Sequence, residues 1–284
     1  MNVTERVGAL LGCPARAAEP NGTAITGRTW RITLADGRQV FVKSQPGAAD
    51  GFFAAEVAGL RWLATAPQGP PVPAVLGWDH ETLILPWITA GAPSDAGVER
   101  LGRALTVLHS AGAPGFGADW PGWIGAAELD NRARPSWPDF YLTRRLRPYL
   151  RMLRDAGDLD TAASATFDRL AERLPTLVGP PEPPARTHGD LWSGNVLWDD
   201  TGQAWLIDPA AHGGHRETDL AMLALFGAPG LDRLLAAYNE ATPLPAGWRD
   251  RVGLHQLHPL LVHAVLFGGS YLDRAAAIAR HYAG

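Results

Sequence analysis

The sequence predicts an α+β fold with two lobes, a small β-rich N-terminal lobe and a larger, mainly helical C-terminal lobe. A β-hairpin pattern near the N-terminus and helical periodicity over most of the second half support this prediction. The length of 284 residues also leaves room for two modest domains, which usually run to roughly 100–200 residues each. We expect the lobes to span residues 1–88 and 89–284, with a connector at 86–91 and a ligand cleft between them.

The N-terminal lobe begins, in this interpretation, with an antiparallel strand pair at residues 29–34 and 39–43. Asp36 and Gly37 lie between these runs and favour a tight turn. Residues 48–65 carry apolar side chains at three- and four-residue spacing, which is typical of an amphipathic helix. The apolar run at 83–85 then predicts a short buried strand before the connector.

The C-terminal lobe shows helical periodicity along most of its length. The first helix begins at Val98 and stops at Ala111-Gly112, where a glycine favours a helix end. The remaining predicted helices cover residues 139–155, 159–178, 219–227, 231–241, 248–267 and 270–282. One β-hairpin, at 196–198 and 204–207, interrupts them.

Composition excludes several classes of protein. Hydrophobic residues make up 46% and charged residues 19% of the chain, which predicts a packed globular protein. The net charge is −4 and no basic run is present, so we expect no nucleic-acid partner. Cys13 is the single cysteine, and neither a signal peptide nor an apolar run of membrane-spanning length is visible. We therefore expect a soluble cytoplasmic protein without a membrane partner; the sequence predicts no oligomeric state.

The segment HGDLWSGN at residues 188–195 keeps the H-x-D-x-x-x-x-N spacing of a kinase catalytic loop. Asp208 follows beyond the predicted hairpin, which would bring it back beside Asn195. Phosphoryl transfer needs positioning and charge neutralisation, so this spacing predicts an ATP- and magnesium-dependent phosphotransferase. Asp190 would accept the proton of the attacked hydroxyl, while Asn195 and Asp208 would offer oxygen ligands to magnesium. Taken singly, each of these residues is also a common turn former.

The N-terminal lobe supplies candidates for binding the phosphates of ATP. Lys43 ends a predicted strand and Glu56 lies in the following helix, an order that matches the lysine and glutamate pair of kinases. A glycine-containing segment at 21–27 precedes the first predicted strand, and we expect Gly22 and Thr23 to lie over the phosphates. An ordinary surface turn is the alternative for this segment.

Several histidines and tryptophans have open roles. His212 and His215 suggest a metal site, but no third ligand is evident, so hydrogen-bonded histidines are favoured. His255, His258 and His263 lie on an apolar helix, where core packing is the default. Trp120, Trp123 and Trp137 fall within residues 117–139, a segment that would act either as a substrate lid or as a packed loop.

The motifs HGDLWSGN (188–195) and LIDPAAHGGHRETDLAMLALFG (206–227) resemble the fructosamine kinase, or ketosamine-3-kinase, family. The resemblance extends to FVK at 41–43 and covers nearly the whole chain. It implies a protein-kinase-like fold related to the aminoglycoside phosphotransferases. The implied activity is ATP-dependent phosphorylation of ribulosamine or fructosamine adducts at the sugar 3-hydroxyl, which repairs glycation. The acceptor would be a small ketoamine or a glycated amine or protein.

Residue roles also follow from the resemblance. Leu85 and Trp87 would offer hinge backbone to adenine, Trp192 and His188 would lie at the substrate, and Asp219 would brace the catalytic loop. The sequence departs from the family in its sparse glycine loop and in residues 130–136, where another tryptophan is expected.

Two alternative functions remain open at this point. An aminoglycoside, choline or homoserine phosphotransferase would share the fold and the catalytic residues, although the C-terminal region is not rich in acids. A non-catalytic kinase-like binding protein is expected to have lost one of Lys43, Asp190, Asn195 or Asp208, and all four are present.

Overall fold

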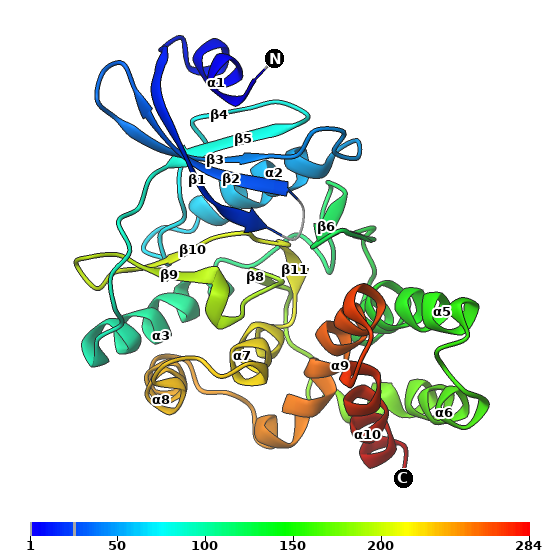
Figure 1. Cartoon of the computed structure of the whole chain (residues 1–284). Helices are drawn as coiled ribbons and strands as arrows, with labels where there is room; N and C mark the ends of the chain where they lie inside the picture. The colour runs from blue at the N-terminus through cyan, green and yellow to red at the C-terminus, as the bar shows by residue number, and fades with distance from the viewer. Residues whose placement is uncertain (1, 25–26) are drawn as a thin grey trace.

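The computed structural model, which describes residues 2–24 and 27–284, has two lobes. A β-sheet with two helices forms the N-terminal lobe, and a larger set of helices forms the C-terminal lobe (Figure 1). The chain passes from one lobe to the other between β5 (Thr82–Pro86) and α3 (Asp95–Ser110). The expected boundary, between residues 88 and 89, falls in this interval. The predicted fold class is confirmed.

The N-terminal sheet has five strands in the order β1-β2-β3-β5-β4, all antiparallel to their neighbours. The other elements of this lobe are β1 (Ala15–Ala24), β2 (Gly27–Leu34), β3 (Gln39–Ser44), β4 (Gly77–Trp78), α1 (Val3–Leu11) and α2 (Phe52–Ala64). Alternation along β3 decides which side chains face which helix. Val40 and Val42 pack with Val7 of α1, whereas Phe41 packs with Phe53 of α2.

Neither α1 nor β1 was predicted. α1 begins with a capping box, in which the Asn2 side chain accepts the Glu5 N–H at 2.9 Å, and ends at Gly12 in the left-handed region. β1 carries few β-branched or aromatic residues, and its register with β2 shifts twice. Its strand conformation depends on pairing with β2, which a local sequence pattern does not report.

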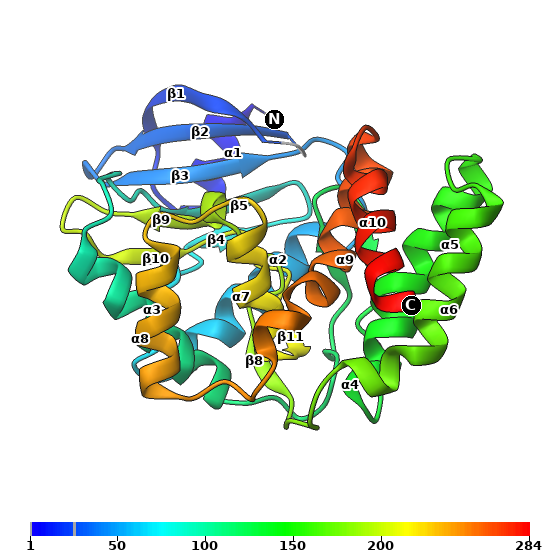
Figure 2. The same cartoon turned by 90° about the horizontal axis from the view of Figure 1, so that it is seen from below.

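The helices of the C-terminal lobe lie close to their predicted positions. One predicted helix, 139–155, is a run of three pieces with a π-helical middle, which ordinary periodicity does not reveal. The pieces are α4 (Trp137–Phe140), η1 (Tyr141–Leu146) and α5 (Arg147–Ala156). The others are α6 (Thr161–Leu177), α7 (Arg216–Leu225), α8 (Leu231–Ala241), α9 (Trp248–Phe267) and α10 (Tyr271–Ala283). Seen from below, α5 and α6 lie side by side next to α10 (Figure 2).

Three short antiparallel ribbons shape the region between the lobes. The predicted hairpin is present as β9 (Val196–Trp198) and β10 (Ala204–Leu206). Two further ribbons are too short for a periodicity signal: β6 (Gly122–Ile124) with β7 (Ala127–Leu129), and β8 (Ala185–Thr187) with β11 (His212–Gly214). Within the described ranges, no helix has both the length and the apolar character needed to span a bilayer.

Candidate active site

The catalytic-loop motif leaves β8 and returns to β9 through the short 3₁₀ turn η2 (Ser193–Asn195). Asp219 on α7, which is fully buried, holds the start of this loop. Its carboxylate accepts the backbone N–H groups of His188 at 2.7 Å and Gly189 at 3.0 Å. Burial acts to raise the pKa of Asp219, but hydrogen bonding to His109 and the other nearby donors outweighs burial and lowers it. Asp219 is therefore an ionised anchor for the loop.

Gly189 is required by the path of the loop. Its φ is +82°, and a Cβ atom there would lie 2.2 Å from the Ala210 carbonyl oxygen. No side chain fits this contact without moving the backbone. The loop is consequently held against the segment that follows Asp208.

Asp190 lies in the cleft beyond Gly189 and is half-buried. Asn195 donates from Nδ2 to the Asp190 carbonyl at 2.8 Å and to its carboxylate at 3.0 Å. Burial, with the added charge of Asp208, raises the pKa of Asp190 to about 7, against the opposing effect of the Asn195 hydrogen bond. A pKa near neutrality suits a group that accepts a proton during a reaction.

Asp208 follows β10 and faces the same cleft. The Ile207 N–H donates to the Asn195 carbonyl at 3.0 Å, so the hairpin brings Asp208 back to the catalytic loop as predicted. Asp208 has φ +55°, a left-handed conformation that aspartate tolerates better than most residues.

Lys43 links the two lobes. Its Nζ donates at 2.7 Å to Glu56 of α2 and at 2.7 Å to Asp208. The predicted ion pair between Lys43 and Glu56 is thus present, because strand alternation places Lys43, like Phe41, on the α2 side of β3. Burial opposes the charge of Lys43, yet the carboxylates of Asp208 and Glu56 outweigh burial and raise its pKa. Burial raises the pKa of Glu56, and the charge of Lys43 opposes that shift.

The oxygen atoms of this cluster fit a magnesium ion. Asp208 uses Oδ1 for Lys43, its side chain is 41% exposed, and Oδ2 has no hydrogen-bond donor among the described residues. Asn195 directs its Nδ2 to Asp190, and its Oδ1 accepts no hydrogen bond within the same part of the chain. Uncommitted carboxylate and amide oxygens are the ligands that magnesium prefers.

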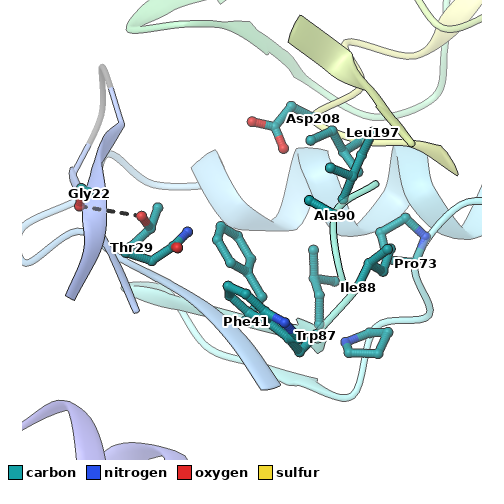
Figure 3. A pocket seen from close by; sticks show the side chains of 13 residues that line it. Gly22, Thr29, Phe41, Pro73, Trp87, Ile88, Ala90, Leu197 and Asp208 are labelled. Atoms are coloured by element: carbon teal, nitrogen blue, oxygen red, sulfur yellow. Dashed lines mark hydrogen bonds between the residues drawn. The ribbon is translucent and has the colours of Figure 1, made fainter. Parts of the chain in front are cut away.

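A cavity of about 460 Å³ lies between the sheet and the β9–β10 hairpin (Figure 3). Phe41, Trp87, Ile88 and Leu197 give it apolar walls, and Asp208 closes one end. Its size and flat apolar sides suit a purine base.

The backbone at this cavity corrects one expectation. Ile84 accepts the Leu76 N–H on the β4 side, so by alternation Leu85 and Trp87 direct their backbone groups toward β3. The Trp87 N–H indeed donates to the Gln39 carbonyl at 3.2 Å. The backbone of Leu85 and Trp87 is therefore engaged in the sheet, and these residues line the cavity with their side chains.

The expected phosphate-covering segment lies at the far end of β1 and the start of β2, and not in a loop before the first strand. Gly22 borders the cavity, with φ +127°, and its carbonyl accepts the Thr29 hydroxyl at 3.3 Å (Figure 3). The side chain of Thr23 and residues 25–26 lie outside the described residues.

A second cavity of about 420 Å³ adjoins the first at Asp208 and contains Lys43 and Asp190. Trp192 lines it and is 39% exposed, and its contact with an acceptor stays a prediction. Gly194 leaves room for this indole, because a Cβ there would lie 2.3 Å from the Trp192 ring. Trp120 and Trp123 line the same cavity.

Trp137 and His188 do not face this cavity, which favours the packed-loop alternative for Trp137 and corrects the expectation for His188. Trp137 is 5% exposed and stacks on Tyr141 and His255 in the core, so it is no part of a lid. His188 is fully buried, and its Nε2 lies 2.9 Å from the Ile207 carbonyl. Its side chain ties the loop to the hairpin and cannot contact an acceptor.

His212 and His215 are buried and hydrogen-bonded. His212 bonds the Ala210 carbonyl at 2.8 Å. His215 lies close to Glu217 and His255, which supplies the third group that the sequence does not reveal. Arg251, however, donates from Nη2 and Nε to the two carboxylate oxygens of Glu217, at 2.6 and 2.9 Å. The Glu217 carboxylate is therefore already paired with a cation. The packing interpretation is the better one.

Sequence reasoning missed a polar network beside the second cavity. Arg145, in the π-helical turn η1, is 1% exposed and donates to Asn131 Oδ1 at 2.7 Å and to the Asp130 carbonyl at 2.7 Å. Asn131 in turn donates to the Trp120 carbonyl at 3.4 Å. This chain of contacts holds the tryptophan wall of the cavity. Its members are far apart in sequence and carry no common motif.

Comparisons with known proteins identify the family of this chain. The model of the family described as fructosamine kinase matches residues 14–283. A relative from Enterococcus faecium, provisionally named a ketoamine kinase, is 36% identical over 248 residues, covering 86% of this chain and 87% of the relative. A protein-ribulosamine 3-kinase from Arabidopsis thaliana is 29% identical over 255 residues, covering 87% and 77%.

Solved structures give the same result. A Thermobifida fusca protein, provisionally named a fructosamine-3-kinase, superposes with a TM-score of 0.94 at 48% identity, over 99% of this chain and 98% of that one. An ADP-bound aminoglycoside phosphotransferase has a TM-score of 0.68 at 13% identity, over 98% and 96%, which shows the shared fold. The chain belongs to the fructosamine kinase family.

Proposed function

We propose that the protein transfers the γ-phosphoryl group of ATP to the 3-hydroxyl of a ribulosamine or fructosamine adduct. The observation that carries this proposal is the meeting of two cavities at Asp208, with Lys43 and Asp190 beside it. One cavity has the shape for adenine, and the other presents a proton acceptor and an exposed indole to a sugar. Family membership supplies the acceptor class.

Asp190 is the proposed catalytic base. The acceptor hydroxyl would hydrogen-bond its carboxylate and lose its proton to it as the new oxygen–phosphorus bond forms and the bond to ADP breaks. Asn195 keeps this carboxylate in place through the 3.0 Å contact. Trp192 would lie against the C–H face of the sugar and orient the hydroxyl.

Lys43 is the proposed phosphate ligand. In kinases of this fold a lysine held by a helix glutamate contacts the phosphate oxygens of ATP, and Glu56 holds Lys43 in this way. Asn195 and Asp208 would hold magnesium, which when bound with ATP neutralises phosphate charge. The contact between Lys43 and Asp208 would then be exchanged for contacts to ATP.

The cellular setting is also a proposal. A single cysteine, Cys13, fits a reducing compartment such as the cytoplasm. The acceptor would be a free ketoamine or a glycated amine of a protein.

The proposal is tested by magnesium-dependent release of ADP with purified protein. The acceptor panel contains a ribulosamine, a fructosamine, an aminoglycoside, choline and homoserine. We expect turnover with a ketoamine, abolished by Asp208→Ala and retained in Asp200→Ala, whose side chain is exposed in the β9–β10 turn. Turnover restricted to another acceptor would contradict the proposed substrate, and no turnover with any acceptor would contradict the enzymatic function.

A further inference from the structure

α2 takes part in both halves of the proposed reaction site. Glu56, in the middle of this helix, accepts the Lys43 Nζ at 2.7 Å, and Lys43 is the proposed phosphate ligand. Phe52, one turn earlier, lines the second cavity, which is the proposed acceptor cavity. The N-cap residue of α2 is Gly51, which has no side-chain oxygen to accept the free N–H groups of the first turn. The position of Glu56 therefore depends on the surfaces against which α2 packs.

Aromatic contacts join α2 to the β6–β7 ribbon of the C-terminal lobe, which lies next to it (Figure 1). Phe52 packs edge-to-face with Trp123, and the ring centroids are 5.5 Å apart. In the last turn of α2, Trp62 packs edge-to-face with Trp120 at 5.4 Å. Aromatic pairs in this arrangement attract each other beyond the area that they bury. The two ribbon tryptophans, Trp120 and Trp123, also line the acceptor cavity, so α2 rests on the wall that an acceptor would contact.

Trp62 also contacts the strand that leads into the catalytic loop. Arg186 of β8 lies over the Trp62 ring, 4.7 Å from its centroid, and donates to the Trp62 carbonyl at 2.8 Å. The same guanidinium donates to Thr65 Oγ1 at 2.6 Å, and a cation at the carbonyl end of a helix is favourable. Gly59 lets the middle of α2 approach the C-terminal lobe closely, since a Cβ there would lie 3.2 Å from Ala211 Cβ. α2 is thus held by the C-terminal lobe along its whole length.

The ribbon is itself fixed from its far side. Asn131 donates to the Trp120 carbonyl at 3.4 Å and accepts a hydrogen bond from the buried Arg145 at 2.7 Å. A Cβ on Gly122 would lie 2.7 Å from Asn131 Nδ2, so the ribbon strand already lies in close contact with this side chain. An acceptor that packs against the ribbon tryptophans therefore also restricts the surface on which α2 rests.

We propose that the contacts of Phe52 and Trp62 with the ribbon make the acceptor and the nucleotide bind cooperatively, with Trp62 as a positioning residue. An acceptor that packs against the ribbon tryptophans fixes α2 on its support. The helix in turn fixes Glu56, which holds Lys43 at the phosphates of the nucleotide. Each substrate should therefore raise the affinity of the other by the same factor. This inference rests on the proposed function and adds an energetic link between its two binding sites.

The test measures the dissociation constant of magnesium ADP with and without saturating fructosyl-lysine, by isothermal titration calorimetry. ADP lacks the γ-phosphoryl group, so its affinity does not report a direct contact between that group and the acceptor. We expect the acceptor to tighten ADP binding to the wild-type protein by at least about fivefold, the lower end of ordinary coupling between sites. Titration of the acceptor at saturating ADP should give the same factor.

Trp62→Leu removes the ring that contacts Trp120 and Arg186, and Trp62 is not among the described residues that line the adenine cavity or the acceptor cavity. We expect ADP alone to bind this variant as tightly as it binds the wild type, while the effect of the acceptor on ADP is lost. Trp62→Phe keeps an aromatic ring and should retain most of the coupling. Trp78→Leu, at an exposed tryptophan of β4, is the control and should keep the wild-type coupling.

Phe52→Leu breaks the second contact and serves as an independent variant should Trp62→Leu fold poorly. Phe52 lines the acceptor cavity, but the coupling factor is a ratio measured at saturating acceptor, so a weaker acceptor affinity does not change it. This variant should also lose the effect of the acceptor on ADP.

The outcomes separate this inference from the proposed function. Equal ADP affinities with and without acceptor in the wild-type protein would overturn the coupling and leave ketoamine phosphorylation intact. Coupling that persists in both Trp62→Leu and Phe52→Leu would overturn the role of the contacts between α2 and the ribbon. Failure of the wild-type protein to phosphorylate a fructosamine would overturn the proposed function, and with it the acceptor that this inference requires.

Discussion

Replacing Asp219 with alanine should weaken both the fold and the catalytic loop. The change removes the acceptor of the His188 and Gly189 N–H groups, which lie 2.7 and 3.0 Å from its oxygens. An unsatisfied buried donor costs about 1–3 kcal/mol, so two of them cost about 2–6 kcal/mol. Whole domains are stable by only about 5–15 kcal/mol. We therefore expect a large loss in the free energy of unfolding.

Asp219 touches neither substrate nor ATP in this account, so it acts through the position of Asp190. Turnover should accordingly fall more than nucleotide affinity. We expect kcat to drop at least about tenfold, the effect of roughly 1.4 kcal/mol in the transition state, while the KM for ATP stays within about twofold. The reason is that Phe41, Trp87 and Leu197 of the adenine cavity lie on other elements.

The assay combines urea unfolding, followed by tryptophan fluorescence, with steady-state kinetics of ADP release. Asp155→Ala, an exposed aspartate on α5, is the control. If Asp219→Ala matches this control in both unfolding free energy and kcat, then the carboxylate does not anchor the loop. An equal loss in kcat and in ATP affinity would also refute the positioning role, because it would indicate general damage to the cleft.

Three further predictions concern the same region. Asp190→Asn should lower kcat by about 100- to 10,000-fold without lowering the free energy of unfolding, because the carboxyl already has a pKa raised to about 7; near-normal turnover would contradict its role as base. Gly189→Ala should lower the melting temperature by about 5–10 °C, since its Cβ would lie 2.2 Å from the Ala210 carbonyl oxygen, and an unchanged thermal scan would refute this. Burial lowers the pKa of His212 and of His215 to about 3, so their stability contribution is present above pH 6.5 and is lost as the pH falls toward 3. Lowering the pH from 7.5 to 5.5 should reduce the free energy of unfolding by about 1.4 kcal/mol for each of the two histidines. Equal urea midpoints at both pH values would contradict their neutral burial.

Much of the fold and the catalytic core is predictable because the relevant patterns are local. The spacing from Asp190 to Asn195 and the hairpin that returns to Asp208 lie within one short stretch of chain. The long helices follow from apolar periodicity. Lys43 could be placed because alternation along β3 aims it at α2.

The remainder depends on contacts between distant segments. The prediction that the backbone of Leu85 and Trp87 faces adenine was wrong, because the Trp87 N–H donates to Gln39 across the sheet. His188 was placed at the acceptor by motif, whereas its burial under the hairpin is a tertiary property. The Arg145 and Asn131 network likewise combines a π-helical turn with a loop, and neither has a sequence signature.

The most direct test of the central claim is the chemical structure of the product formed from fructosyl-lysine and magnesium ATP. Two-dimensional NMR that couples phosphorus to the sugar protons should place the phosphate on O3 with the wild-type protein. The Asp190→Asn variant should give no detectable product in the same time. Phosphate on another oxygen would contradict the proposed orientation of the sugar at Asp190, and hydrolysis of ATP without any phosphorylated ketoamine would contradict the assignment of the acceptor.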